Sequence, residues 1–222
     1  MFKKIIILFK LGRKVAQSDI LEIISKFQKP PLIIKIIFKI LSFSFSSVKK
    51  SKLEKDIGRE LSRSLESMGT TFIKLGQFLA TRPDIIGEKF SKELEKLQDK
   101  LPPFSLKKAQ EILKNDLNNV TYDSIMNLSE PVAAASIAQV HKAQINDNGT
   151  IKDVAIKILR PNIKRIFNEE IDAIMLLAFF IESVIKKTKR LKLVEVVFLL
   201  KEITNLEMDL RFEAAAANEY AE

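Results

Sequence analysis

The stretch at 131–161, PVAAASIAQVHKAQINDNGTIKDVAIKILRP, decides the fold of this chain. Within it, residues 136–145 and 151–159 are each typical of a β-strand. The Asn-Asp-Asn-Gly sequence at 146–149 is typical of the tight turn that joins two antiparallel strands. The stretch therefore predicts a β-hairpin.

The second strand of this hairpin carries a charge in an apolar setting. Side chains alternate between the two faces of a strand, so Val154, Ile156 and Ile158 would share one face and Lys157 would lie on the other. Burying an ammonium group is costly unless it is paired. Val-Ala-Ile-Lys is also the form of the kinase strand whose lysine holds the nucleotide phosphates. The alternative is an edge-strand lysine that reaches solvent.

A phosphate-binding lysine needs two supporting features. The small side chains of residues 133–136 would let backbone amides approach phosphate oxygens closely, although alanine adopts positive φ less freely than glycine. These residues are Ala133, Ala134, Ala135 and Ser136. A kinase also needs a glutamate on a following helix to pair with the lysine. The acids available near the end of the chain are Glu207, Asp209 and Glu213.

Helices are predicted before the hairpin. Apolar residues recur every three or four positions over 53–79, which is the helical period, and Gly69 interrupts them. Asp84 is expected to start a further helix that runs through Leu97.

Helices are also predicted directly before the strands and after them. Ser105 is expected to cap a helix through Leu113. Two long helices are expected after the hairpin, at about 163–187 and 192–221. The fold class predicted from these patterns is α+β, with a small antiparallel sheet and several helices.

Composition limits the chemistry that this chain can carry. It has no cysteine, so disulfides and thiolate metal sites are excluded, and its one histidine, His141, excludes a multi-histidine metal site. We expect His141 to be a packed structural residue and expect no metal site in this chain. The formal net charge is +9, but residues 1–52 alone carry +10 and the remainder carries −1.

The basic N-terminal segment combines cations with apolar residues. Residues 1–45 are predicted to form two amphipathic helices separated by Pro30 and Pro31. Such a segment is suited to an anionic membrane surface, which we favour. The alternative is that these helices pack on the body of the protein. Nucleic acid is not an expected partner, because the cations are not mixed with polar and aromatic readers. No segment has the roughly 20 apolar residues that span a bilayer.

Four motifs in order give the chain a family resemblance. The first is TFIKLGQ at 71–77, followed by TRPD at 81–84 and LQD at 97–99. The others are PVAAASIAQVHKA at 131–143, VAIKILRP at 154–161, and Glu207-Met208-Asp209 followed by Glu213. From about residue 53 onward the chain resembles the UbiB family of atypical kinase-like proteins.

The resemblance implies a protein-kinase-like fold with an added helical extension at its N-terminus. Members bind ATP or ADP with Mg²⁺ and support ubiquinone biosynthesis at a membrane, here expected on the cytoplasmic face of the inner membrane and peripheral. They behave as ATPases or unorthodox kinases, and partners would be biosynthetic proteins or isoprenoid lipids. An older description of some members is polyprenylphenol hydroxylase, which no flavin or metal motif of this chain supports. The domains expected are 1–52 (membrane-facing helices), 53–120 (helical extension) and 121–222 (kinase-like N-lobe).

The resemblance also implies roles for particular residues. Lys157 would hold the nucleotide phosphates, together with the alanine-rich segment, and Glu213 would pair with it. Lys74 and Gln77 would lie on the substrate side, near Glu207 and Asp209, where their helix is thought to block ordinary protein substrates. Arg82 and Asp84 are expected to form an ion pair at a helix end.

Several kinase residues are not found in this sequence. After Arg160 the only aspartates are Asp172 and Asp209, and neither precedes Phe-Gly. A kinase-like fold is therefore expected to stop before its C-lobe and to be inactive alone. The reading frame is expected to be either truncated or split, and if it is split, a separately encoded C-lobe is a candidate partner. One alternative is a non-enzymatic module that binds membranes or isoprenoid lipids and carries vestigial kinase motifs. Another is a chain with no stable fold.

Overall fold

A computed structural model describes residues 57–97, 101–147, 149–184 and 186–219, together with six residues between 6 and 13. The predicted membrane-facing helices at 1–52 thus lie almost wholly outside the described residues. The chain forms two compact units, each made of two sequence segments. The first comprises residues 1–98 and 165–204, and the second comprises 99–164 and 205–222.

The first unit is helical. Its elements are α4 (Ile57–Met68), α5 (Thr70–Ala80), α6 (Pro83–Ile86), α7 (Glu88–Leu94), most of α10 (Ile163–Val184), the 3₁₀-helix η2 (Lys186–Leu191) and most of α11 (Leu193–Glu207). Of the helices described, none has the length and apolar character that crossing a bilayer requires.

Two glycines set the helix boundaries in this unit. Gly69 has a φ of 100° and separates α4 from α5, which confirms the predicted break. Gly87 has a φ of 83° and separates α6 from α7. The single helix predicted from Asp84 through Leu97 is therefore wrong, because a residue with positive φ lies inside it. Such a φ is readily adopted by glycine and ends a regular helix.

A third glycine, Gly76, allows α5 to approach its neighbours. It is buried, and a β-carbon at this position would lie 2.9 Å from Leu65 Cδ1 and closer still to Leu97 Cδ1. Both leucines are themselves buried, with 4% and 6% of their surface exposed. The glycine between Lys74 and Gln77 is thus explained by close packing.

We expect Gly76→Ala to lower the free energy of unfolding by about 1–3 kcal/mol, despite the better helix propensity of alanine, because the added methyl overpacks the core. Denaturant unfolding measures the change. In a double-mutant cycle, Leu97→Ala should be less harmful in the Gly76→Ala background than in the wild type, because it makes room for the methyl. Simple additivity of the two changes would contradict the packing explanation.

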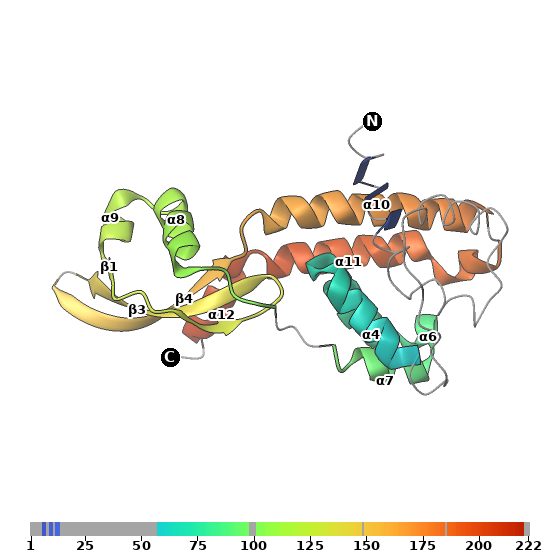
Figure 1. The fold of residues 1–222 in the computed structure, drawn as a ribbon, viewed down its shortest axis with the longest axis horizontal. Helices are drawn as coiled ribbons and strands as arrows, with labels where there is room; N and C mark the ends of the chain where they lie inside the picture. The colour runs from blue at the N-terminus through green and yellow to red at the C-terminus, as the bar shows by residue number, and fades with distance from the viewer. Residues whose placement is uncertain are drawn as a thin grey trace. The chain divides into compact units, whose positions relative to one another are not determined.

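The long helices α10 and α11 lie side by side (Figure 1). Buried residues such as Ile171, Ala178 and Leu200 contribute to the core. Lys201 Nζ of α11 lies 2.8 Å from Asp172 Oδ1 of α10 and forms an ion pair. Glu182 Oε1 accepts a hydrogen bond of 3.2 Å from the Val194 N–H, which occupies one of the free amides at the start of α11.

The second unit contains a four-stranded antiparallel sheet. Its elements are α8 (Leu106–Asp116), α9 (Asn119–Asp123), β1 (Ile125–Met126), β2 (Pro131–Ala134), β3 (Ala138–Asp147), β4 (Thr150–Leu159) and α12 (Leu210–Glu219). β4 pairs with β3 along its whole length, from Ala138↔Leu159 to Asp147↔Thr150. β1 and β2 pair with different parts of β3 on its other edge. The predicted hairpin is confirmed, and Gly149 in its turn has a φ of 89°.

One face of the sheet is buried against α8. Ile158 of β4 packs with Ala109 and Leu113 in a core that Ile156 also contacts. The predicted cap of α8 is confirmed, because Ser105 Oγ accepts a 3.3 Å hydrogen bond from the Lys108 N–H. The alternation predicted for the second strand thus directs Ile156 and Ile158 into the core.

A polar network is buried under this face. The Gln139 side-chain amide makes two hydrogen bonds to the backbone of Phe104, one from the Phe104 N–H (2.9 Å) and one to the Phe104 carbonyl (3.1 Å). The same amide nitrogen lies 2.9 Å from His141 Nε2, and His141 Nδ1 lies 2.7 Å from the Ser129 carbonyl. These contacts assign a neutral ring protonated at Nδ1. His141 is fully buried and connects the sheet to the segments around it.

Gln139→Met should destabilise the protein by about 2 kcal/mol or more, because it leaves the Phe104 N–H and carbonyl without their buried partner. Urea unfolding of this variant is compared with that of Gln110→Met, the same change at an exposed position on α8. Equal stability of the two variants would show that the network is dispensable.

The single final helix predicted at 192–221 is also wrong. α11 ends at Glu207 and α12 begins at Leu210. Met208, between them, is buried to 1% exposure, and Asp209 Oδ1 accepts a hydrogen bond of 3.2 Å from the Arg211 N–H. The break thus combines a buried side chain with an aspartate that caps the new helix.

Candidate functional site

The face of the sheet opposite α8 carries the candidate site. Lys157 pairs with Val140, and Val140 pairs with Ala133 on the next strand. Residues directly opposite each other in a sheet point to the same face, so these three side chains form one row across β4, β3 and β2. α8 lies on one side of the sheet and α12 on the other (Figure 1).

Lys157 is paired on this face. Its Nζ lies 2.5 Å from Glu213 Oε2 of α12, 56 residues later in the chain. The lysine side chain is 33% exposed and the glutamate side chain 60%. The ammonium group is therefore neither enclosed in the core nor separated from a carboxylate. The structure brings together the two residues predicted to pair, on a surface that a ligand can reach.

The loop within the alanine-rich segment is shorter than the loop predicted from the sequence. Ala133 and Ala134 belong to β2 and pair with Val140 and Gln139, so the turn comprises residues 135–137. The Ala135 N–H donates a 2.8 Å hydrogen bond to the Ala138 carbonyl, which closes the turn. Ser136 is fully buried. What this turn can offer a ligand at its surface is therefore mainly backbone.

Arg160 holds this turn in place, and the sequence reasoning missed it. Its guanidinium donates to the Ala135 carbonyl from Nε (3.0 Å) and Nη2 (2.8 Å). It also donates to the carbonyls of Pro102 (2.9 Å) and Leu101 (3.1 Å), and its backbone N–H bonds to the Ile137 carbonyl (2.8 Å). A cation directly after a strand and before a proline was the only signal in the sequence. Arg160 is a positioning residue for the turn.

We expect Arg160→Lys to loosen the turn, because an ammonium group lacks the planar fork that reaches these carbonyls together. Amide hydrogen exchange at Ala135 should accelerate by about tenfold or more. Exchange in the hairpin at 143–147 and 150–154 should not change. Arg165→Lys is the matched control, since the exposed Arg165 forms its ion pair with a half-buried glutamate of the same helix, Glu169, at 3.4 Å. Unchanged exchange at Ala135 in Arg160→Lys would contradict this role.

The remaining predicted residues are divided between the two units. Lys74 and Gln77 lie on α5 in the first unit, three residues apart on one helix face, and both are half-buried. Glu207 and Asp209 lie in the second unit, where Glu207 is exposed. The predicted proximity of Lys74 to these acids joins the two units and stays a prediction.

Asp209 has a local partner in its own unit. Its carboxylate forms a bidentate pair with the Arg211 guanidinium, with distances of 2.8 Å and 2.5 Å. The hydrogen bonds from Arg211 lower the pKa of Asp209 from 3.8 to about 2. The carboxylate is thus fully ionised at neutral pH and available both as a helix cap and as an acceptor.

Arg211→Gln should raise the pKa of Asp209 back toward 3.8, because it removes the main cause of the shift. A depressed pKa contributes stability above the ordinary value, and this contribution is lost as pH falls through the folded-state pKa. For α12 the window lies between pH 3.8 and about 2. NMR titration of the Asp209 carboxyl carbon measures both values. The same titration curve in both proteins would exclude Arg211 as the cause.

The chemistry of the site is that of a surface cation beside small side chains. A lysine on an open sheet face beside small side chains is suited to a phosphate group. Within the described part of the chain, no three His, Asp or Glu side chains are grouped so that they could hold a metal ion. The described residues can therefore offer a cation to a phosphate group.

Comparison with known proteins shows the family of this chain. The sequence model of the ABC1 atypical kinase-like domain matches residues 96–222, which include β1–β4, Lys157 and Glu213. The chain belongs to the UbiB family. It is 31% identical over 189 residues to the "Probable protein kinase UbiB" of Shewanella pealeana. This match covers 85% of the present chain and 34% of the relative.

Other UbiB relatives give a similar result. The proteins of the same name from Shewanella denitrificans and Marinobacter nauticus are 31% identical over 211 residues and 36% identical over 163 residues. These matches cover 94% and 73% of this chain and 37% and 29% of the relatives. The chain thus spans about a third of the length of the curated UbiB proteins it matches. No solved structure matches it.

Proposed function

We propose that this chain is the N-terminal portion of a UbiB-type ATP-dependent kinase or ATPase that supports ubiquinone biosynthesis. The observation that carries the proposal is the Lys157–Glu213 ion pair on the open face of the sheet. The family membership supports it, because a lysine on a strand paired with a glutamate on a helix is a recurring part of kinase sites.

Each residue of the site has a distinct task in this proposal. Lys157 binds the phosphates of ATP or ADP, and Glu213 fixes the orientation of the ammonium group. The turn at 135–137, held by Arg160, limits the space beside the phosphates. Mg²⁺, when bound, offsets phosphate charge, and its ligands come from outside the described residues. Lys74 and Gln77 restrict access of ordinary protein substrates.

The proposal extends to location and partners. Residues 1–52 carry a formal charge of +10, and their cations alternate with apolar stretches. This pattern suits peripheral binding to the cytoplasmic face of the inner membrane. Partners there would be ubiquinone-biosynthesis proteins or isoprenoid lipids. Catalysis also needs the residues that form a kinase C-lobe, whether on the same polypeptide or on another.

Photo-crosslinking with 8-azido-ATP tests the nucleotide site. Lys157→Met should reduce labelling of the chain at least about tenfold, because it removes the charge that faces the phosphates. Lys152→Met is the matched control. Lys152 lies on the same strand and forms a similar surface ion pair, with Asp147 at 2.6 Å. Labelling that is equal in the two variants, or that excess unlabelled ATP does not suppress, would overturn the proposal.

A further inference from the structure

A cavity in the helical unit is lined by described residues that do not belong to the nucleotide site. It has a volume of about 300 Å³ and is formed by α6, by the end of η2 and by the start of α11. All of its lining residues belong to the first compact unit. None of the roles given above to Lys157, Glu213 or Arg160 uses it.

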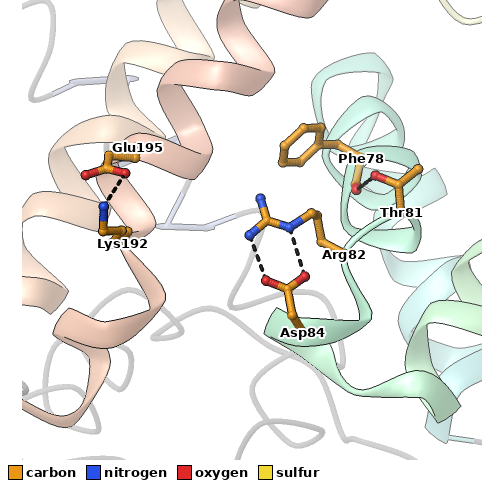
Figure 2. A network of polar contacts seen from close by, with 6 residues as sticks. All are labelled: Phe78, Thr81, Arg82, Asp84, Lys192 and Glu195. Carbon is orange, nitrogen blue, oxygen red and sulfur yellow. Dashed lines mark hydrogen bonds and ion pairs between the residues drawn. The ribbon is translucent and has the colours of Figure 1, made fainter.

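The polar part of this cavity is cationic. Among the described residues, Arg82, Arg190 and Lys192 line it together with two carboxylates, Asp84 and Glu195. Arg82 donates to Asp84 from Nε (2.8 Å) and Nη2 (2.7 Å), and Lys192 Nζ lies 3.0 Å from Glu195 Oε2. The Arg82 guanidinium points toward the segment that carries Lys192 and Glu195 (Figure 2). Arg190 therefore gives the lining a net positive charge.

The segment that carries Lys192 has an uncommon backbone conformation and is rich in cations. Lys192 adopts a φ of 47°, which is uncommon for a residue with a side chain. Residues 186–192, KKTKRLK, contain five cations and no acid. The hydrogen bonds that Arg82 donates to Asp84 lower the pKa of the carboxylate and raise the pKa of the guanidinium, so this pair stays charged at neutral pH. The bidentate pair uses two of the five N–H donors of the guanidinium.

The rest of the cavity is aliphatic and continues along α11. Ile85, Leu191, Val196 and Leu199 complete the lining. Val196, Leu199 and Ile203 are spaced by three and four residues, so they share one helix face. Leu199 and Ile203 are 44% and 38% exposed. A charged recess thus leads into an exposed apolar strip, a combination that a free phosphate ion would not need.

We infer that this cavity binds the phosphate headgroup of an anionic lipid, with an acyl or isoprenoid chain lying along Leu199 and Ile203. The phosphate oxygens accept hydrogen bonds from the Nη groups of Arg82, the Arg190 guanidinium and the Lys192 ammonium. This contact is separate from any contact made by residues 1–52. It also shares no described residue with the proposed nucleotide site, so an experiment can disprove one of the two sites and leave the other.

A single tryptophan tests the site directly, because the natural chain contains none. Leu191→Trp places the fluorophore in the lining of the cavity in the full chain. Vesicles of brominated phosphatidylglycerol should quench it, whereas vesicles of brominated phosphatidylcholine should quench it much less. A local probe is needed because residues 1–52 can bring the chain to a membrane without filling this cavity. Val120→Trp, at an exposed position on α9, is the control for non-specific quenching.

Charge variants in the Leu191→Trp background decide the result. Arg190→Gln with Lys192→Gln should raise the lipid concentration needed for half-maximal quenching by about tenfold or more. Glu195→Gln should lower that concentration. Lys107→Gln with Lys114→Gln, two exposed cations on α8, should change little. If inorganic pyrophosphate shifts the emission and vesicles do not, the cavity takes a soluble anion and the inference of a lipid ligand is overturned. If neither ligand acts, or if Arg190 and Lys192 do not matter, the inference is overturned.

Discussion

The antiparallel pairing of β3 with β4 is the constraint on which the rest of the site depends. Side chains alternate along a strand, so Ile158 cannot be buried against α8 unless Lys157 lies on the opposite face. A slip of one residue would exchange the two and bury the ammonium group under α8. The hydrophobic core therefore fixes the position of the charge. Glu213 on α12 meets that charge 56 residues later in the chain.

Polar contacts across long sequence distances hold the other parts of this unit. Gln139 binds the backbone of Phe104, and Arg160 binds the carbonyls of Leu101, Pro102 and Ala135. Both residues connect the segment before α8 to the sheet. The turn beside Lys157 is thereby held by the same contacts that attach α8, which links the stability of the fold to the shape of the proposed site.

The features that depend on local sequence could be predicted. The hairpin follows from its turn residues and the break at Gly69 from the lost period, while the cap at Ser105 follows from side-chain chemistry. The split at Gly87 and the end of α11 were missed because each depends on a backbone conformation or a buried side chain that periodicity does not report. The contacts of Arg160 could not be predicted, because carbonyl partners carry no side-chain signal. The UbiB resemblance supplied Glu213 as the partner of Lys157, which spacing alone left open among three acids.

Lysine acylation in the presence and absence of MgATP tests the central claim most directly. Acetylation of the native chain by an N-hydroxysuccinimide ester, followed by mass spectrometry, gives a rate for each lysine. The account predicts that nucleotide slows modification of Lys157 and leaves that of Lys152, five residues earlier on the same strand, unchanged. Equal rates at Lys157 with and without nucleotide, under conditions where the nucleotide is bound, would contradict it.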